Sequence, residues 1–175
     1  MYKMKESILI TGSSGALGTE ISKKIKNNNL LLPSSKDLDL TSQKSIDTFF
    51  SKNKVDTLIH CASLVGGISF NLDNQYDMAR VNSLININIL DACNRFNIAK
   101  LITMGSSCCY PINAEKPFKE SSYTPGPLEK SNLNYALTKL LMSEAIKAHN
   151  EKFKTNYKTV ILCNLFSPPK KAKQD

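Results

Sequence analysis

Short apolar runs alternate along the chain with longer segments in which apolar residues recur every three or four positions. The runs predict five strands, at residues 7–10, 30–32, 55–62, 101–104 and 159–165. The helical spacing predicts a helix through Leu17, Ile21 and Ile25, and further helices at residues 42–52, 78–96 and 135–153. Strands that alternate with helices are typical of a parallel sheet with crossover helices, so we expect the α/β class.

In a sheet of this kind, ligands bind beyond the carboxyl ends of the strands. Candidate chemistry is therefore sought in the segments that follow the predicted strands. These are residues 11–12, 34–36, 62–67 and 105–110, and the stretch from Asn164 onward.

Length and charge limit the function classes. The 175 residues suit one domain of ordinary size. The net charge is +8, yet 21 of the 23 basic residues are lysines spread along the chain, and the only basic block is at Lys170, Lys171 and Lys173. A solvated lysine-rich surface explains this pattern, so we expect no nucleic-acid partner.

The sequence favours a cytoplasmic protein. No apolar run approaches the ~18 to 20 residues that cross a bilayer, and the first residues lack the apolar stretch of a signal peptide. The five cysteines have no Cys-x-x-Cys spacing, so we expect reduced thiols and no metal site.

A glycine-rich loop separates the first strand from the first helix. In a strand–loop–helix setting, glycines let backbone amides and the helix N-terminus approach a pyrophosphate. We therefore expect a dinucleotide site and, with it, a Rossmann-type doubly wound sheet; a structural turn is the alternative. The loop residues are Gly12, Ser13, Ser14, Gly15, Ala16, Leu17 and Gly18.

The residues after the second strand bear on the choice of dinucleotide. Sites for NAD usually place an acid there, whose carboxylate accepts a hydrogen bond from the ribose 2′-hydroxyl. Here the stretch reads Pro33-Ser34-Ser35-Lys36, and hydroxyls with a lysine suit a 2′-phosphate. We expect NADP (NADPH) as the cofactor, with Lys36 near the phosphate and Asp39 beside the adenine. A solvated loop is the alternative.

Tyr135 and Lys139 are four residues apart on a predicted helix, so both side chains lie on one face. A lysine cation near an oxidised nicotinamide would favour the tyrosinate and suit the phenol for proton transfer at neutral pH. By itself, Tyr-x-x-x-Lys also arises by chance in helices.

The segment Gly105-Ser106-Ser107-Cys108 directly follows the fourth strand. A small hydroxyl residue there can hydrogen-bond a substrate oxygen, and a thiol can exchange a proton with carbon if its pKa is suitably tuned. In isolation these are ordinary loop residues.

Together, these motifs resemble the extended short-chain dehydrogenase/reductase family. Residues 65–71, 105–111 and 126–139 narrow the likeness to its GDP-L-fucose synthases, and the likeness runs from about residue 7 to residue 166. The resemblance implies an NADPH-dependent epimerase-reductase whose GDP-sugar substrate is GDP-4-keto-6-deoxy-D-mannose.

The resemblance also assigns roles to residues. Ser106 and Tyr135 would hold the sugar C4 oxygen, and Tyr135 would protonate it. Lys139 would bind the nicotinamide ribose and lower the pKa of Tyr135. Cys108 would be the acid/base thiol for inversion beside the ketone. The residues expected to line the nicotinamide are Leu162, Asn164 and Leu165.

The chain departs from the family after residue 166. Family members continue into a smaller C-terminal domain, which grips the GDP-sugar and supplies a histidine, and neither His60 nor His149 is placed to replace it. We expect an NADP-binding domain over residues 1–166, a disordered tail over 167–175, a missing substrate domain and little turnover. Family analogy suggests a homodimer formed through the helices at 78–96 and 135–153.

Two alternatives remain open at this point. The first is another nucleotide-sugar epimerase or dehydratase; such enzymes usually lack a cysteine at the position of Cys108 and often carry an acid where Lys36 stands. The second is a nucleotide-binding remnant without turnover.

Overall fold

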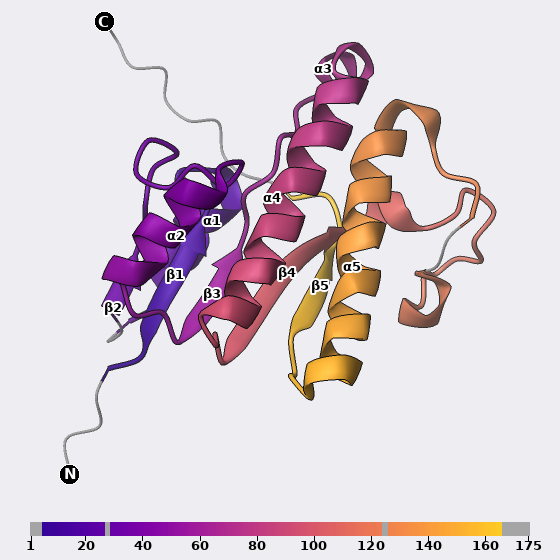
Figure 1. Cartoon of the computed structure of the whole chain (residues 1–175). Coiled ribbons are helices and arrows are strands. Elements are labelled where there is room, and N and C mark those ends of the chain that lie inside the picture. Colours follow the sequence, from indigo (N-terminus) through magenta and orange to yellow (C-terminus); the bar gives the residue numbers. More distant parts are fainter. Residues whose placement is uncertain (1–4, 27–28, 124–125, 166–175) are drawn as a thin grey trace, which may run out of the picture.

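A single parallel sheet organises the computed structural model, which describes residues 5–26, 29–123 and 126–165. The strand order is β2-β1-β3-β4-β5, and every neighbouring pair is parallel (Figure 1). The strands are β1 Ser7–Thr11, β2 Asn29–Leu31, β3 Thr57–His60, β4 Lys100–Ser106 and β5 Lys158–Leu162. The expected α/β fold is confirmed, whereas the expected tail at 167–175 lies outside the described residues.

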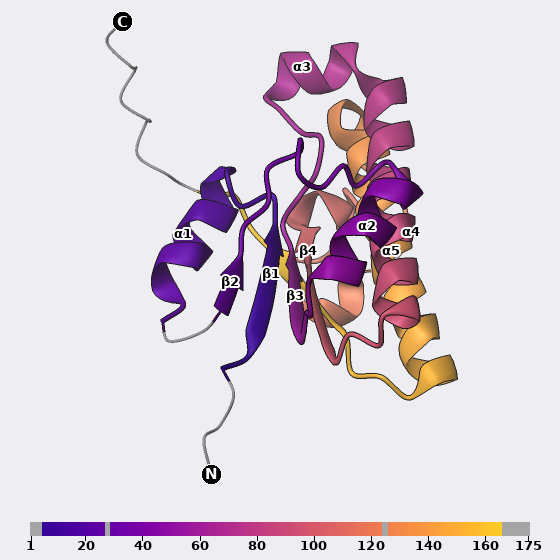
Figure 2. The same cartoon turned by 60° about the vertical axis from the view of Figure 1, so that its left-hand side comes forward.

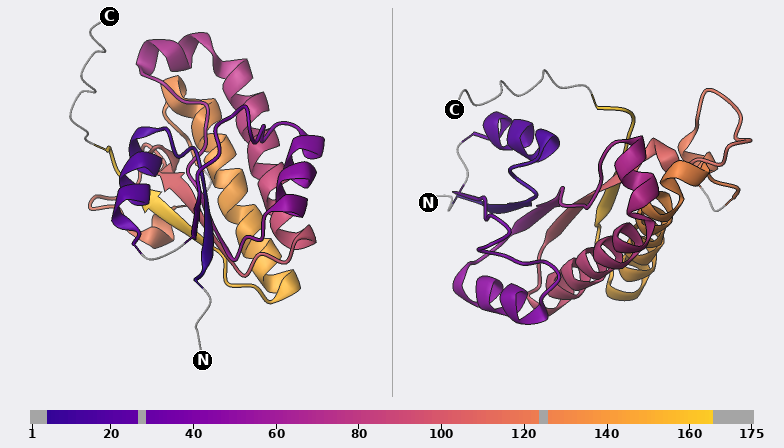
Figure 3. Two further views of the ribbon diagram at one scale, coloured as in Figure 1. Left: turned by 90° about the vertical axis from the view of Figure 1, so that its left-hand side faces the viewer. Right: turned by 90° about the horizontal axis from the view of Figure 1, so that it is seen from above.

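Helices cover both faces of the sheet. Helix α1 lies on one face, and α2, α4 and α5 lie on the other (Figures 2 and 3). The α-helices are α1 Ala16–Lys24, α2 Gln43–Lys52, α3 Ile68–Asp73, α4 Gln75–Arg95 and α5 Leu133–Phe153; the short 3-10 turns are η1 Ser107–Cys109, η2 Glu120–Ser122 and η3 Lys130–Asn132. None of the helices in the described part of the chain is long and apolar enough to cross a membrane.

The alternation of side chains along the strands builds two apolar layers. Leu9, Leu58 and Leu101 face α2, α4 and α5 in the larger core. Ile8, Ile10 and Ile59 point the other way, toward α1. Because both faces of β1 and β3 are buried, these two strands read in the sequence as continuous apolar runs.

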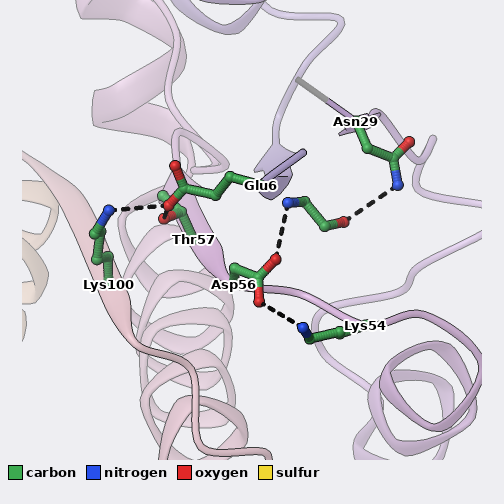
Figure 4. A network of polar contacts seen from close by, with 7 residues as sticks. Glu6, Asn29, Lys54, Asp56, Thr57 and Lys100 are labelled. Carbon is green, nitrogen blue, oxygen red and sulfur yellow. Dashed lines mark hydrogen bonds and ion pairs between the residues drawn. The ribbon is translucent and has the colours of Figure 1, made fainter. Parts of the chain in front are cut away.

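A polar network fixes the amino ends of the strands (Figure 4). The Asp56 carboxylate accepts the backbone N–H of Ser7 at 2.9 Å, and the Glu6 carboxylate accepts the Thr57 hydroxyl at 2.6 Å and the Lys100 ammonium at 3.0 Å. These contacts connect β1, β3 and β4 at their amino ends, at the opposite end of the sheet from the expected ligand site.

Two differences from the expected elements affect the site. Helix α3 was not expected; it has only six residues, and its apolar side chains Ile68, Phe70 and Leu72 alternate with polar ones and are exposed. Strand β4 continues to Ser106 and β5 ends at Leu162, so residues 163–165 form a loop instead of the end of a strand.

Candidate functional site

A cleft lies beyond the carboxyl ends of the strands. Its larger part has a volume of about 910 Å³ and its smaller part about 440 Å³. The two parts share Gly12, Gly15, Cys61 and Ser63 as lining residues, so they are continuous. The glycine-rich loop lies where they join, which is where the central part of an extended dinucleotide would be held.

The backbone of the glycine-rich loop requires its glycines. Gly12 has φ +68°, and a Cβ there would lie 2.7 Å from the Ala62 backbone nitrogen. The Gly15 N–H donates to the Gly12 carbonyl at 3.0 Å, which closes the turn. A Cβ on Gly18 would collide with the Gly12 carbonyl oxygen, so the start of α1 packs directly on the loop.

Helix α1 begins at this loop without a side-chain cap. Gly15 is its N-cap residue and offers no side chain to the first turn. A helix N-terminus that carries partial positive charge and faces a cleft favours an anion such as a phosphate. The loop therefore fits the pyrophosphate of a dinucleotide.

The structure places the loop residues on different parts of the cleft wall. Gly12 and Gly15 line both parts. Ser14 lines the smaller part, whereas Ala16, Leu17 and Gly18 line the larger. Ser13 lines neither, and its carbonyl accepts the Thr19 hydroxyl at 3.0 Å.

The segment after β2 forms one wall of the smaller part. Ser34, Ser35 and Asp39 line it, whereas Lys36 is exposed on the adjoining turn and does not. The Asp37 carboxylate accepts the Ser34 backbone N–H at 3.0 Å and the Ser34 hydroxyl at 2.6 Å, and these bonds lower the pKa of Asp37. The first acid after β2 is thus used to shape the turn.

The four residues with expected catalytic roles, Ser106, Cys108, Tyr135 and Lys139, all line the larger part of the cleft. Ser106 ends β4, and its hydroxyl accepts the Cys108 backbone N–H at 3.3 Å, which turns the chain into η1. Tyr135 and Lys139 come from the first two turns of α5. Residues 27 to 33 positions apart in the sequence therefore line the same part of the cleft.

Hydrogen bonds to Glu129 shape the approach to α5. Its carboxylate accepts the backbone N–H groups of Ser131 at 3.0 Å and Asn132 at 3.2 Å, which caps η3 just before the helix. The helix then presents Tyr135 and Lys139 to the cleft.

Burial changes the proton affinities of both cleft residues on α5. The pKa of Tyr135 is raised to about 12 by burial and by the nearby thiols of Cys108 and Cys109. The pKa of Lys139 is lowered to about 8 by burial, against the opposing effect of Cys109 and Cys61. The pKa of Tyr135 therefore lies above its ordinary value in this structure, and the expectation that Lys139 lowers it beside a bound nicotinamide stays a prediction.

The end of the chain's described part completes the larger part of the cleft. Leu162, Asn164 and Leu165 line it, as does Cys163. Residue 166, which ends the stretch of resemblance, lies outside the described residues.

Several wall residues were not identified from the sequence. Asn71 is buried; its Oδ1 accepts the Gly66 N–H at 3.0 Å, and its amide donates to Asn132 Oδ1 at 2.8 Å. Asn71 and Asn132 both line the larger part of the cleft, but neither follows a strand, so position in the fold gave no signal. Cys61 also lines the cleft but was expected inside the strand at 55–62, whereas Ser63 lies in the segment 62–67 that the strand-end rule had indicated.

Tyr123 packs against the end of β4, which forms part of the cleft wall. Its buried hydroxyl accepts the Ser106 backbone N–H at 3.5 Å and would lie 2.9 Å from a Cβ at Gly105. Among the described residues, no group of three histidine, cysteine or acidic side chains is arranged to hold a metal ion.

Comparison with known proteins shows the family of this chain and of its fold. The model of the NAD dependent epimerase/dehydratase family matches residues 8–175. GDP-L-colitose synthase of Yersinia pseudotuberculosis is 38% identical over 162 residues, which are 91% of this chain and 53% of that protein. GDP-L-fucose synthase of Dictyostelium discoideum is 33% identical over 169 residues, 94% of this chain and 53% of that protein.

Solved structures give the same result. A GDP-L-fucose synthetase from Naegleria fowleri bound to NADP has a TM-score of 0.86 at 29% identity, over 96% of this chain and 53% of that one. A GDP-mannoheptose C4 reductase from Campylobacter jejuni with NADP bound has a TM-score of 0.86 at 30% identity, over 95% of this chain and 54% of that one. The chain spans about half the length of the curated relatives it matches. It belongs to the NAD dependent epimerase/dehydratase family.

Proposed function

We propose that this chain is the cofactor-binding and catalytic half of an NADPH-dependent epimerase-reductase for GDP-linked 4-keto sugars, with GDP-4-keto-6-deoxy-D-mannose as its substrate. The observation that carries the proposal is that Ser106, Cys108, Tyr135 and Lys139 line one cleft, continuous with the glycine-rich loop. The relatives named as GDP-L-fucose synthases and GDP-sugar reductases support the substrate class.

The cofactor would lie across the two parts of the cleft. Gly12 and Gly15 would hold the pyrophosphate, and Ser34, Ser35 and Asp39 would surround the adenosine end. Leu162, Asn164 and Leu165 would border the nicotinamide. Lys36 is exposed beside the adenosine end, where a 2′-phosphate would attract it. When bound, NADPH supplies the hydride for reduction.

Tyr135 is suited to be the proton donor. Because burial raises its pKa to about 12, the phenol is protonated at neutral pH. It would donate a hydrogen bond to the sugar C4 oxygen together with Ser106 and would transfer its proton as the hydride reaches C4. Lys139, one turn away, would hold the nicotinamide ribose and stabilise the tyrosinate left behind.

Cys108, which lines the larger part of the cleft, would serve the inversion steps. As a thiolate, its sulfur would remove a proton from the carbon beside the ketone, and the carbonyl would stabilise the resulting carbanion as an enolate. A second acid would return a proton to the opposite face. We expect that acid from the remainder of a longer enzyme, since neither described histidine lines the cleft.

The proposal is tested by joining residues 1–165 to the C-terminal half of the Dictyostelium GDP-L-fucose synthase. We expect the hybrid to oxidise NADPH in the presence of GDP-4-keto-6-deoxy-D-mannose and to form GDP-L-fucose, identified by chromatography. A folded hybrid that binds both ligands without turnover would contradict the catalytic part of the proposal and favour a nucleotide-binding remnant.

A further inference from the structure

A row of buried polar groups runs beneath the cleft from the sheet to α5. It consists of the Thr11 hydroxyl, the His60 ring, the Asn86 amide and the Thr138 carbonyl, from β1, β3, α4 and α5. All four residues are buried, and His60 is 1% exposed. One end of the row adjoins Gly12 of the glycine-rich loop, and the other adjoins Lys139.

The hydrogen bonds in this row have a fixed direction. The Thr138 carbonyl can only accept, so Asn86 Nδ2 donates to it, at 3.1 Å. Asn86 Oδ1 then faces His60 Nε2 at 3.3 Å, and this nitrogen must carry the ring proton. His60 Nδ1 is left as the acceptor of the Thr11 hydroxyl at 2.7 Å.

These hydrogen-bond directions require a neutral His60 ring. Burial, together with the neighbouring Lys139 ammonium, lowers the pKa of His60 to about 3, so the ring is neutral at physiological pH. The other titratable groups that act on Lys139 are the thiols of Cys61 and Cys109, and the Tyr135 ring lies beside its ammonium. Two of these groups also bond the backbone of α5: the Cys109 thiol donates to the Ala136 carbonyl at 3.4 Å, and Asn86 of the row donates to the carbonyl of Thr138, the residue directly before Lys139.

We propose that Asn86, oriented by His60, is a positioning residue for Lys139. Its hydrogen bond to the Thr138 carbonyl fixes the peptide group that joins Thr138 to Lys139. The row connects that peptide group to the carboxyl end of β1, directly before Gly12. The distance across the cleft between the pyrophosphate loop and the lysine is thereby held constant. This inference rests on the proposed function, in which those two groups grip the same cofactor.

A fixed backbone at Lys139 matters because a lysine side chain has many rotamers. Holding the ammonium in a buried place costs conformational entropy and hydration, so it stays there only while its backbone is held. Without the bond from Asn86, we expect the ammonium to move toward water and recover a pKa nearer the ordinary lysine value of 10.5.

The test compares Asn86→Ala with Asn88→Ala. Asn88, on the same helix, also donates its amide to a backbone carbonyl, that of Leu40 at 2.9 Å, and it does not line the cleft. The two changes remove the same kind of bond. The first readout is the pH dependence of Lys139 acetylation by acetic anhydride, measured on the cofactor-free chain by peptide mass spectrometry. The second is the dissociation constant of NADPH.

For Asn86→Ala, we expect the midpoint of the Lys139 labelling curve to rise from about pH 8 by about one unit. NADPH binding should weaken about three- to tenfold, the effect of losing one hydrogen bond. Asn88→Ala should change neither. An unchanged Lys139 midpoint in Asn86→Ala would overturn the inference, because a purely structural role lowers stability without moving that midpoint.

A second variant covers the case in which Asn86→Ala does not fold. Asn86→Thr keeps more of the side-chain volume, but its hydroxyl is too short to reach the Thr138 carbonyl, so the same shift is expected. If the wild-type chain does not bind NADPH, the proposed function fails, and the labelling curves still decide whether Asn86 positions Lys139.

Discussion

The ammonium group of Lys139 lies 5.4 Å from the centre of the Tyr135 ring, one helical turn away along α5. Burial acts on the two groups in opposite directions: it raises the pKa of Tyr135 to about 12 and lowers that of Lys139 to about 8. At neutral pH the phenol therefore keeps its proton, while the lysine holds its charge only weakly.

Replacing Lys139 by Met should stabilise the fold while weakening cofactor binding. The folded-state pKa of Lys139 lies below the unfolded value, so the unfolded chain binds more protons between pH 8 and 10.5. The cost of burying the ammonium is complete below pH 8 and disappears above about pH 10.5. At pH 7 we expect the free energy of unfolding to rise by about 1–3 kcal/mol.

Urea unfolding at pH 7 and pH 10.5 measures this effect. The gain from Lys139→Met should be larger at pH 7 than at pH 10.5, and NADPH affinity should fall more than about tenfold. The exposed Lys158, changed in the same way, is the control. A loss of stability at pH 7 would show that the buried ammonium is stabilised by its surroundings.

Tyr135→Phe should remove reduction and leave cofactor binding intact. In the hybrid enzyme, we expect the rate of NADPH oxidation to fall by about 10²- to 10⁴-fold, because the C4 oxygen loses its proton donor. The NADPH dissociation constant should change less than about twofold. Tyr76→Phe, at an exposed position that lines neither part of the cleft, is the matched control. Near-normal turnover in Tyr135→Phe would assign the proton to another group.

Lys36→Glu should reduce the preference for NADPH over NADH. The change places a carboxylate beside the expected 2′-phosphate, where repulsion weakens NADPH binding and leaves NADH binding almost unchanged. We expect a drop of about fivefold to tenfold in the affinity ratio at low salt. Lys158→Glu makes the same change of charge at the start of β5, and its ratio should match the wild type. Equal ratios in the two variants would remove Lys36 from the site.

Gly12→Ala and Gly67→Ala form a matched pair within the cleft wall. A Cβ at Gly12 meets the Ala62 backbone at 2.7 Å and requires φ +68°, whereas one at Gly67 meets nothing within 4 Å. We expect Gly12→Ala to lose about 2 kcal/mol or more of stability and to abolish NADPH binding. Gly67→Ala should stay within about 0.5 kcal/mol of wild type. Thermal unfolding and NADPH titration compare them, and similar losses in both would contradict the loop geometry.

Much of the fold could be predicted because its signals are local. Strands β1 and β3 are buried on both faces and read as apolar runs, and the glycines of residues 12–18 mark the loop between β1 and α1. The order of strands and helices along the chain was enough to place Ser106 and Tyr135 near the carboxyl ends of the strands.

Other features depend on packing that no local pattern encodes. Helix α3 was missed because it spans only six residues, in which the apolar Ile68, Phe70 and Leu72 alternate with polar side chains. The raised pKa of Tyr135 was not expected, because it comes from burial in the folded cleft and from the nearby thiols of Cys108 and Cys109. The sequence indicated only that His60 does not replace the family's C-terminal histidine, and its bonds to Thr11 and Asn86 depend on the folded packing.

Titration of the chain with NADPH, followed by cofactor fluorescence, tests the central claim most directly. The account predicts saturable binding of one NADPH per chain, displaced by adenosine 2′,5′-bisphosphate, which occupies only the smaller part of the cleft. It also predicts that binding disappears in Gly12→Ala and persists in Gly67→Ala. Absence of saturation with folded wild-type chain, or binding that the bisphosphate does not displace, would contradict it.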